Sequence, residues 1–111
     1  LGKANNINVN DYKNVSLAYV AKTPYDLTNV TFTGTIQYIE DQEITGYLVV
    51  RDYQGNMVYV EIIGSNLKPY YKGDFIRVYG MIVGESKGDI ALNGQPVILT
   101  KVSLGKVVRA N

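Results

Sequence analysis

The side chains best suited to binding chemistry recur at every second position between residues 46 and 63. The odd-numbered positions of this run mix aromatic, charged and apolar side chains: Tyr47, Val49, Arg51, Tyr53, Met57, Tyr59 and Glu61. Tyrosine rings can stack on bases or sugars, at about 1–3 kcal/mol per base, and a guanidinium can reach a phosphate or carboxylate. The same side chains could instead form a cross-strand cluster that binds nothing, with Arg51 over Tyr59, at about 0.2–1 kcal/mol per pair. If a ligand binds here, we predict that it contacts Tyr47, Arg51, Tyr53 and Tyr59.

These positions share a face only if the run forms a hairpin of two strands. β-Branched and aromatic residues dominate the run, and a glycine flanks it at each end. We expect a three-residue loop at 54–56, in which Gly55 or Asn56 takes a positive φ. Such a loop pairs Arg51 with Tyr59. It also gathers the aliphatic residues on the opposite face, which must then be core: Leu48, Val50, Val58, Val60 and Ile62.

The sequence lacks the residues that most catalytic and metal sites use. It contains no cysteine and no histidine, which excludes disulfides, thiolate ligands and the commonest general base. Ser65 and Ser103 each precede a lysine by three positions, but the companion motifs of serine–lysine enzymes are absent. The acidic run 40–43 lacks the ordered oxygens and the glycine of a calcium loop. We therefore predict no catalytic activity, no bound metal and no cofactor.

Length and charge favour one small domain. The 111 residues can bury a single core, and no apolar stretch is long enough to span a membrane. The chain starts at Leu1 without a signal pattern, so we expect a processed form or an excerpt. The absence of cysteine fits secretion, and the net charge of +1 indicates no polyanionic partner. Residues 1–63 hold four Lys/Arg and seven Asp/Glu, whereas residues 64–111 hold seven and three, an asymmetry that could orient a ligand.

The N-terminal residues predict one helix. Residues 1–9 are polar and without periodicity, and we expect them to be a flexible lead-in. Asn10 or Asp11 can cap a helix that reaches about Ala21, and an apolar stripe at helical spacing supports it. Pro24 cannot continue a helix and so ends it. Part of the same run could also be extended.

Strand patterns occupy most of the remaining sequence. Alternation from Val30 to Ile39 predicts a strand, with a bulge or bend at Gly34. We expect the acidic run 40–43 to be a turn into the hairpin and residues 84–96 to be a loop. Two further strands and a short basic tail complete the chain: 75–83, 97–104 and 105–111.

Three stretches carry a resemblance to a known fold. Residues 32–36, Phe-Thr-Gly-Thr-Ile, resemble its glycine-containing first strand. Residues 47–55, Tyr-Leu-Val-Val-Arg-Asp-Tyr-Gln-Gly, are similar to strand two of anticodon-binding domains of this fold. Residues 73–80, Gly-Asp-Phe-Ile-Arg-Val-Tyr-Gly, resemble the strand-four run Gly-Asp-x-[Val/Ile]-x-Val-x-Gly. The fold that these stretches resemble is the OB-fold.

The resemblance implies a mainly β domain over residues 10–104, a five-stranded OB-like Greek-key barrel with one N-terminal helix. The helix ahead of strand one, with Tyr12, Pro24 and Tyr25, is similar to OB-type domains of secreted lipoproteins and surface proteins of Gram-positive bacteria. Many OB-folds place a plugging helix between strands three and four. Residues 64–72 are too short for one, so we expect the N-terminal helix to plug the barrel instead.

The same resemblance implies a binding site on the outer face of strands two and three. Lys72 and Lys87 are expected at its periphery, whereas the carboxylates of Glu40, Asp41 and Glu43 would repel phosphates there. We therefore predict a non-catalytic binding module, extracellular or at a cell surface, for an unknown ligand or protein partner. Two alternatives stay open: a cytoplasmic domain that binds single-stranded nucleic acid, and a structural module of a larger protein.

Overall fold

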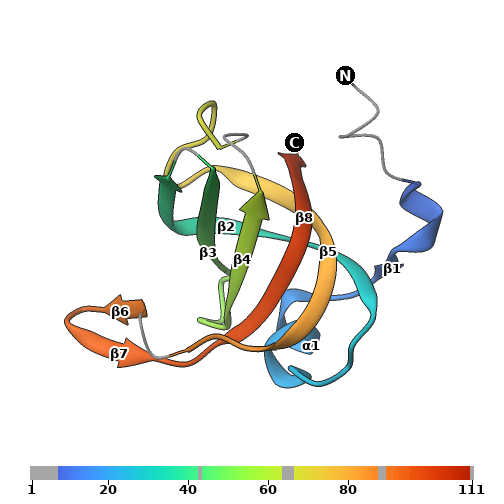
Figure 1. The fold of residues 1–111 in the computed structure, drawn as a ribbon, viewed down its shortest axis with the longest axis horizontal. Helices are drawn as coiled ribbons and strands as arrows, with labels where there is room; N and C mark the ends of the chain where they lie inside the picture. The colour runs from blue at the N-terminus through green and yellow to red at the C-terminus, as the bar shows by residue number, and fades with distance from the viewer. Residues whose placement is uncertain (1–7, 43, 64–66, 88–89, 111) are drawn as a thin grey trace.

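The computed structural model describes residues 8–42, 44–63, 67–87 and 90–110, so most of the predicted lead-in lies outside the described residues. Three short elements come first: the 3₁₀ helix η2 (Val9–Asp11), strand β1 (Lys13–Asn14) and helix α1 (Leu17–Lys22). Strands make up most of the remaining chain (Figure 1): β2 (Asn29–Gln42), β3 (Thr45–Arg51), β4 (Met57–Ile63), β5 (Phe75–Glu85), β6 (Ile90–Leu92), β7 (Gln95–Val97) and β8 (Thr100–Arg109).

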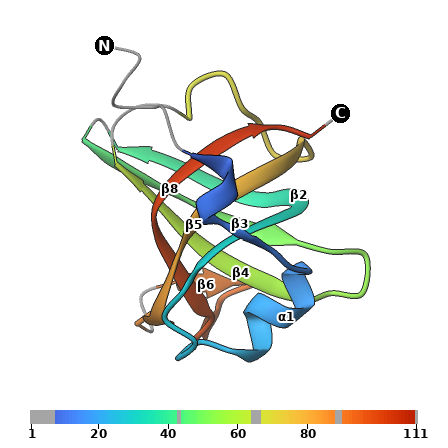
Figure 2. The same cartoon turned by 90° about the vertical axis from the view of Figure 1, so that its right-hand side faces the viewer.

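Five of these strands close into a barrel. The order is β2-β3-β4-β8-β5, and β5 pairs back onto β2 to complete the ring (Figure 2). Strand β4 runs parallel to β8, whereas the other four pairs of the ring are antiparallel. Closure leaves β1 and the small β6–β7 hairpin outside the ring. This order is the Greek-key topology of the OB-fold, which confirms the predicted fold class.

The aliphatic face of the β3–β4 hairpin forms the centre of the core, as predicted. Its five side chains are at most 1% exposed: Leu48, Val50, Val58, Val60 and Ile62. The alternate residues Ile76, Val78 and Ile82 of β5 are equally buried and belong to the same cluster. The period-2 pattern therefore identifies which face of each strand points inward.

The pairing of β3 with β4 differs from the prediction by two residues. Arg51 pairs with Met57, and the loop has five residues instead of three. The carboxylate of Asp52 fixes this loop, accepting hydrogen bonds from the backbone N–H of Gln54 (3.0 Å) and Asn56 (2.9 Å). Partial burial raises the pKa of Asp52, but the hydrogen bonds outweigh it and hold that pKa below its ordinary value. A shift of two residues preserves the parity of every position, so the predicted faces survive.

Helix α1 is shorter than the predicted helix and begins later. Ser16, not Asn10 or Asp11, is its N-cap, and the Ser16 Oγ accepts from the backbone N–H of Tyr19 (3.0 Å). Before it, residues 13–14 are extended because β1 pairs in parallel with the start of β2, and residues 9–11 form only the 3₁₀ helix η2. A serine cap with strand pairing on its N-terminal side outweighs the helical spacing of the apolar residues there. The helix ends before Pro24, as predicted.

Strand β2 is longer than predicted, and its irregularity lies elsewhere. It continues through Glu40 and Asp41, so the expected acidic turn is strand, and Glu43 lies outside the described residues. The register shifts between Ile36 and Tyr38, not at Gly34. Glycine is needed at position 34 for space, since a Cβ there would lie 2.5 Å from Val50 Cγ1 and 2.7 Å from Leu17 Cδ1.

The C-terminal third contains more strand than predicted. Instead of a loop over 84–96, β5 runs to Glu85, and β6 and β7 form a hairpin across Asn93 and Gly94, both at positive φ. Strand β8 starts at Thr100 and continues to Arg109, so residues 105–109 of the expected basic tail are part of the barrel. Pairing with β5 along its whole length extends this strand beyond what its local sequence indicates.

Both ends of the barrel are filled by side chains from outside the ring. At one end α1 contributes Leu17 and Val20, which are 3% and 0% exposed (Figures 1 and 2). At the other end Leu67, from the β4–β5 connector, is 1% exposed and lies against Gly46. Among the described residues, no helix is long and apolar enough to cross a membrane.

We predict that Leu17→Ala lowers the free energy of unfolding by about 2–5 kcal/mol, because it opens a cavity next to Gly34. Urea denaturation followed by circular dichroism measures this loss. Leu27→Ala is the control, because Leu27 is 62% exposed and should change stability by less than about 0.5 kcal/mol. Equal effects of the two substitutions would mean that α1 does not complete the core.

Candidate functional site

Three tyrosines form a row across the outer face of the barrel. Tyr38 on β2, Tyr47 on β3 and Tyr59 on β4 come from three adjacent strands. The rings of Tyr47 and Tyr59 are stacked, with centroids 5.0 Å apart and an interplanar angle of 20°. The rings of Tyr38 and Tyr47 are tilted by 33° at 5.8 Å. We call these three residues the tyrosine row.

Strand register brings the row together. Val49 pairs with Tyr38 on one side and with Tyr59 on the other, so the two rings flank it. Val49 is 0% exposed although it belongs to the outward set of β3. Tyr47 lies two positions from Val49 on the same face, within diagonal reach of Tyr59. The row therefore rests on a buried aliphatic residue.

A cation and a carboxylate close the row at its β4 end. The Lys101 ammonium lies 6.0 Å from the centroid of the Tyr59 ring and 3.6 Å from Glu61 Oε1. The Ser103 hydroxyl donates to the same oxygen at 3.0 Å. In the cluster predicted for this face, Lys101 lies beside Tyr59, and Arg51 pairs with Met57 instead of with Tyr59. Ion pairs this exposed contribute little to stability, roughly 0–1 kcal/mol.

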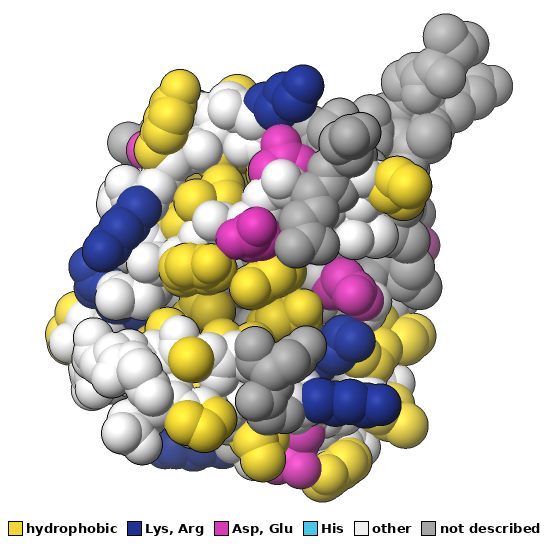
Figure 3. Space-filling view, turned by 60° about the vertical axis from the view of Figure 1, so that its left-hand side comes forward, with side chains coloured by type: hydrophobic (Ala, Val, Ile, Leu, Met, Phe, Trp, Pro, Cys, Tyr) yellow, Lys and Arg dark blue, Asp and Glu magenta, His cyan; other side chains and the backbone are white. Residues whose placement is uncertain are grey.

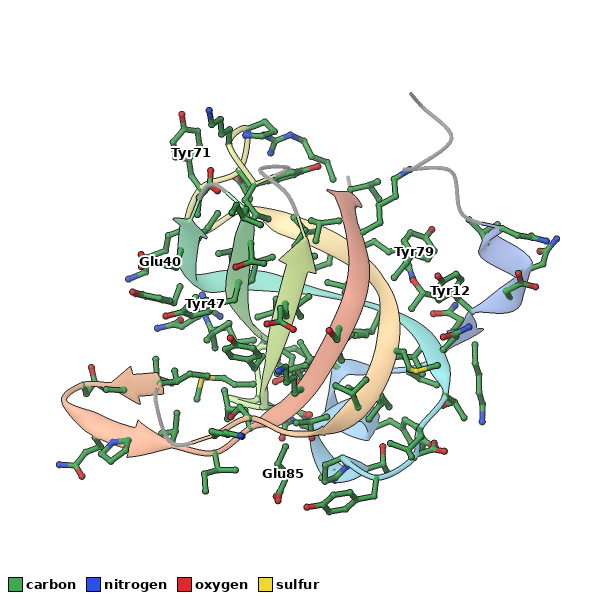
Figure 4. All side chains as sticks on the ribbon, viewed as in Figure 1. Tyr12, Glu40, Tyr47, Tyr71, Tyr79 and Glu85 are labelled. Atoms are coloured by element: carbon green, nitrogen blue, oxygen red, sulfur yellow. The ribbon has the colours of Figure 1, made fainter. Side chains whose placement is uncertain are left out.

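A tyrosine–carboxylate pair closes the row at its β2 end. The Tyr38 hydroxyl donates to Glu40 Oε1 at 2.9 Å. This bond, with a further hydrogen bond to Tyr47, raises the pKa of Tyr38 to about 12. Figure 4 shows Glu40 and Tyr47 on one side of the molecule, and Tyr12 and Tyr79 on another.

Carboxylates outnumber ammonium groups around the row. Among the described residues that hydrogen-bond the row or line the cavity beside it, three are of the former kind and two of the latter: Glu40, Glu61, Glu85, Lys87 and Lys101. A small cavity of about 170 Å³ lies at the β4 end, between Tyr59 and the segment that precedes β6. Figure 3 shows apolar side chains, tyrosines included, gathered on this face with charged side chains around them. The charge beside the row is therefore slightly negative, which gives an anionic ligand no net attraction there.

The structure separates the predicted contact residues into several places. Tyr47 and Tyr59 lie together in the row. Arg51 lies at the end of β3, two residues after Val49, and its Nε donates to Gln37 Oε1 at 2.8 Å. Tyr53 is 91% exposed in the β3–β4 loop, away from the row. The two peripheral lysines also diverge: Lys87 lines the small cavity next to Tyr59, and Lys72 lies in the turn before β5.

Sequence reasoning missed Tyr38 and Lys101. Simple alternation puts Tyr38 on the core side with Ile36, but the register shift between them turns it outward to 40% exposure. The clustered polar residues after Tyr38 were the available signal for an irregular strand. Lys101 reaches the row because Tyr59 pairs with it in the parallel β4–β8 ladder. No local pattern in the sequence indicates a pairing between strands so far apart.

The row can hold a ligand but supplies no evident reactive group. In the described part of the chain, no three Asp or Glu side chains gather into a group that could hold a metal ion. Because Tyr47 has a ring contact on each side, a ligand would meet mainly ring edges and hydroxyl groups, not open ring faces. Phenol hydroxyls both donate and accept hydrogen bonds, and carboxylates accept them.

Comparison with known proteins identifies the fold. No protein-family model matches the sequence, and no curated protein matches it significantly. An aspartyl-tRNA synthetase from Entamoeba histolytica is similar to 90% of this chain over 22% of its own, with a TM-score of 0.61 and 8% identity. An asparaginyl-tRNA synthetase from the same organism is similar to 90% of the chain over 24% of its own, with a TM-score of 0.57 and 17% identity.

A protein described as an aspartyl-tRNA synthetase from Leishmania major gives the same result. It matches 90% of this chain over 21% of its own, with a TM-score of 0.59 and 10% identity. The chain therefore spans less than a quarter of the length of each of these three proteins. At these identities the likeness shows a shared OB-fold.

We predict that Glu40→Gln lowers the pKa of Tyr38 from about 12 towards its ordinary value of 10.0, because a neutral amide replaces the charged carboxylate that accepts the hydroxyl hydrogen. Because the pKa of Tyr38 is higher in the folded state than in the unfolded state, the protonated phenol stabilises the folded state at pH values below the unfolded-state pKa. That contribution is present below pH 10.0 and is lost as the pH rises towards 12. NMR of ¹³C-tyrosine-labelled protein during a pH titration resolves each ring.

Glu85→Gln is the matched control for this titration. Its carboxylate accepts from the Tyr25 hydroxyl at 2.7 Å and raises the pKa of Tyr25. The control should therefore lower the pKa of Tyr25 and leave that of Tyr38 unchanged. A Tyr38 pKa that does not respond to Glu40→Gln would contradict the assignment of the hydrogen bond.

Proposed function

We propose that this chain is a non-catalytic OB-fold binding module that holds an extended ligand across the tyrosine row. The observation that carries this proposal is the row itself, three tyrosines from β2, β3 and β4 on the face that OB-folds commonly use for ligands. The row rests on the buried Val49, so the platform is held in place before a ligand arrives. Preorganisation of this kind lowers the entropic cost of binding.

The ligand that fits this surface best is a neutral oligosaccharide. Its hydroxyls can hydrogen-bond the phenol groups of the row and the carboxylates of Glu40 and Glu61. Its ring C–H groups can make van der Waals contact with the exposed atoms of the tyrosine rings. A phosphate backbone fits less well, because carboxylates outnumber ammonium groups around the row. Stacked bases also need open ring faces, and the contacts within the row occupy those of Tyr47.

An extracellular or cell-surface setting belongs to the same proposal. It extends the expected resemblance of the segment before β2 to OB-type domains of Gram-positive surface proteins, and the absence of cysteine is compatible with it. Oligosaccharides are abundant on such surfaces, which makes the setting and the ligand class consistent with each other.

Single-stranded nucleic acid is the second candidate ligand. The observation in its favour is the fold shared with the aspartyl- and asparaginyl-tRNA synthetases, together with aromatic side chains on the face that OB-folds use for oligonucleotides. On this alternative Lys87 and Lys101 contact phosphates, and binding weakens steeply as the salt concentration rises. A sugar ligand shows little salt dependence.

The test is a binding measurement with two probe sets, a panel of neutral bacterial and plant oligosaccharides and a labelled oligothymidylate. We expect oligosaccharide binding that Tyr47→Ala and Tyr59→Ala each weaken at least about tenfold, the scale of one lost ring contact. Calorimetry or a glycan array measures the first set and fluorescence anisotropy at about 50 mM salt the second.

Tyr53→Ala is the matched control, because Tyr53 is also exposed but lies away from the row. It should leave oligosaccharide affinity unchanged. If the protein binds oligothymidylate and Tyr47→Ala abolishes that binding, single-stranded nucleic acid replaces the oligosaccharide as the ligand. If neither probe set binds, or if both row variants bind like the parent protein, the proposal fails and the structural module gains support.

A further inference from the structure

A cleft of about 520 Å³ opens where β2, the β3–β4 loop and the start of α1 meet. Its walls include residues 33–35 of β2, residues 51–54, residues 16–18 and Phe75 at the start of β5. The volume lies within the range of roughly 300–1,000 Å³ that small-ligand sites occupy. None of the three tyrosines of the row lines it, so the cleft is separate from the face described above.

Strand pairing is incomplete along the wall that β2 contributes. On this edge β1 pairs with Val30 and Thr31, and β3 begins to pair at Thr35, so no described strand covers Thr33 there. The backbone N–H of Val15 donates to the Thr31 carbonyl at 3.0 Å, which shows that the Thr31 backbone groups face this edge. Alternate residues of a strand face the same edge. The N–H and C=O of Thr33 therefore face the cleft.

The cleft offers a cationic donor that is not fully used within the fold. Two charged residues line it, Arg51 and Asp52. The Asp52 carboxylate already accepts hydrogen bonds from the backbone of Gln54 and from the backbone and side chain of Asn56. Arg51 uses one of its five N–H donors for Gln37. A carboxylate is the ligand group that complements an arginine with further donors in a fixed fork.

The remaining lining is largely apolar. Leu17 and Ala18 contribute from α1, and Phe75 is 45% exposed. Tyr53, which is 91% exposed, is also part of the lining. An exposed aromatic pair beside a concave surface is typical of a site that receives an apolar side chain.

We propose that this cleft binds the C-terminal residue of an extended peptide whose last side chain is apolar. The peptide lies as a short strand along this edge of β2, and its backbone hydrogen-bonds the N–H and C=O of Thr33. The terminal carboxylate pairs with the Arg51 guanidinium, and the last side chain packs on Leu17, Ala18 and Phe75. A peptide is preferred over a nucleotide because the N–H and C=O of Thr33 are complemented by a carbonyl and an amide N–H at the spacing of a β-strand.

The first test uses the tripeptide N-acetyl-Gly-Gly-Leu as a free acid and as the matching carboxamide. Binding is followed by ¹H–¹⁵N NMR and calorimetry on the whole 111-residue chain. In the free protein, we expect the Thr33 amide to exchange with solvent faster than those of Phe32 and Gly34, which face β5. The free acid should slow exchange at Thr33, and the carboxamide should bind at least about tenfold more weakly.

Two variants locate the contacts. Arg51→Gln should weaken the free acid at least about tenfold and remove the difference between acid and carboxamide, whereas Arg51→Lys retains part of it. Phe75→Ala should weaken both peptides without changing their ratio. Tyr47→Ala is the control, because it alters the tyrosine row and should leave peptide affinity unchanged.

Three outcomes overturn the proposal: equal affinity for acid and carboxamide, slow exchange at Thr33 in the free protein, or no peptide binding at any soluble concentration. Adenosine monophosphate that shifts the cleft resonances while the tripeptide does not would assign the cleft to a nucleotide instead. Oligosaccharide binding is measured on the same samples. Failure of the cleft and failure of the tyrosine row are therefore distinguishable.

Discussion

The close approach of three chain segments at Gly34 is the constraint on which the rest of the structure depends. Strand β2 pairs with β5 along its first half and with β3 along its second, and the ring closes because one strand makes both pairings. Next to the change of partner at Thr35, β2 lies against Val50 and Leu17, and any side chain at position 34 would occupy the space that they fill. Packing of this density transmits a displacement at one residue to the whole barrel.

The change of partner at Thr35 also divides the surface of β2 into two regions with different chemistry. Beyond it, the strand carries Tyr38 and Glu40 into a face of aromatic rings and carboxylates. Before it, the strand carries Thr33, whose backbone faces a cleft that Arg51 lines. The different side chains of the two regions favour different ligands at each, because the local field of a small domain is set by a few groups within about a Debye length of roughly 10 Å.

The part of the fold that could be predicted from the sequence was which alternate residues of the central hairpin face the core. Alternation assigned Leu48, Val50, Val58, Val60 and Ile62 to the core, and this assignment is correct although the hairpin register was wrong by two residues. The side chain of Asp52 decides that register by organising a five-residue loop, and no strand pattern contains this information. Contacts between distant strands were equally out of reach, so Lys101 was missed next to Tyr59. The tyrosine row is thus a product of the bulge after Ile36 and of barrel closure.

The parallel pairing of β4 with β8 has a consequence for synthesis of the chain. Strand β8 is the last strand of the barrel, and it supplies the partner for both β4 and β5. While a ribosome still holds residues 100–109, two strand edges of the nascent chain have no partner and the aliphatic core is open on that side. Assembly must therefore wait for this segment, and a chaperone has its best opportunity to act in that interval.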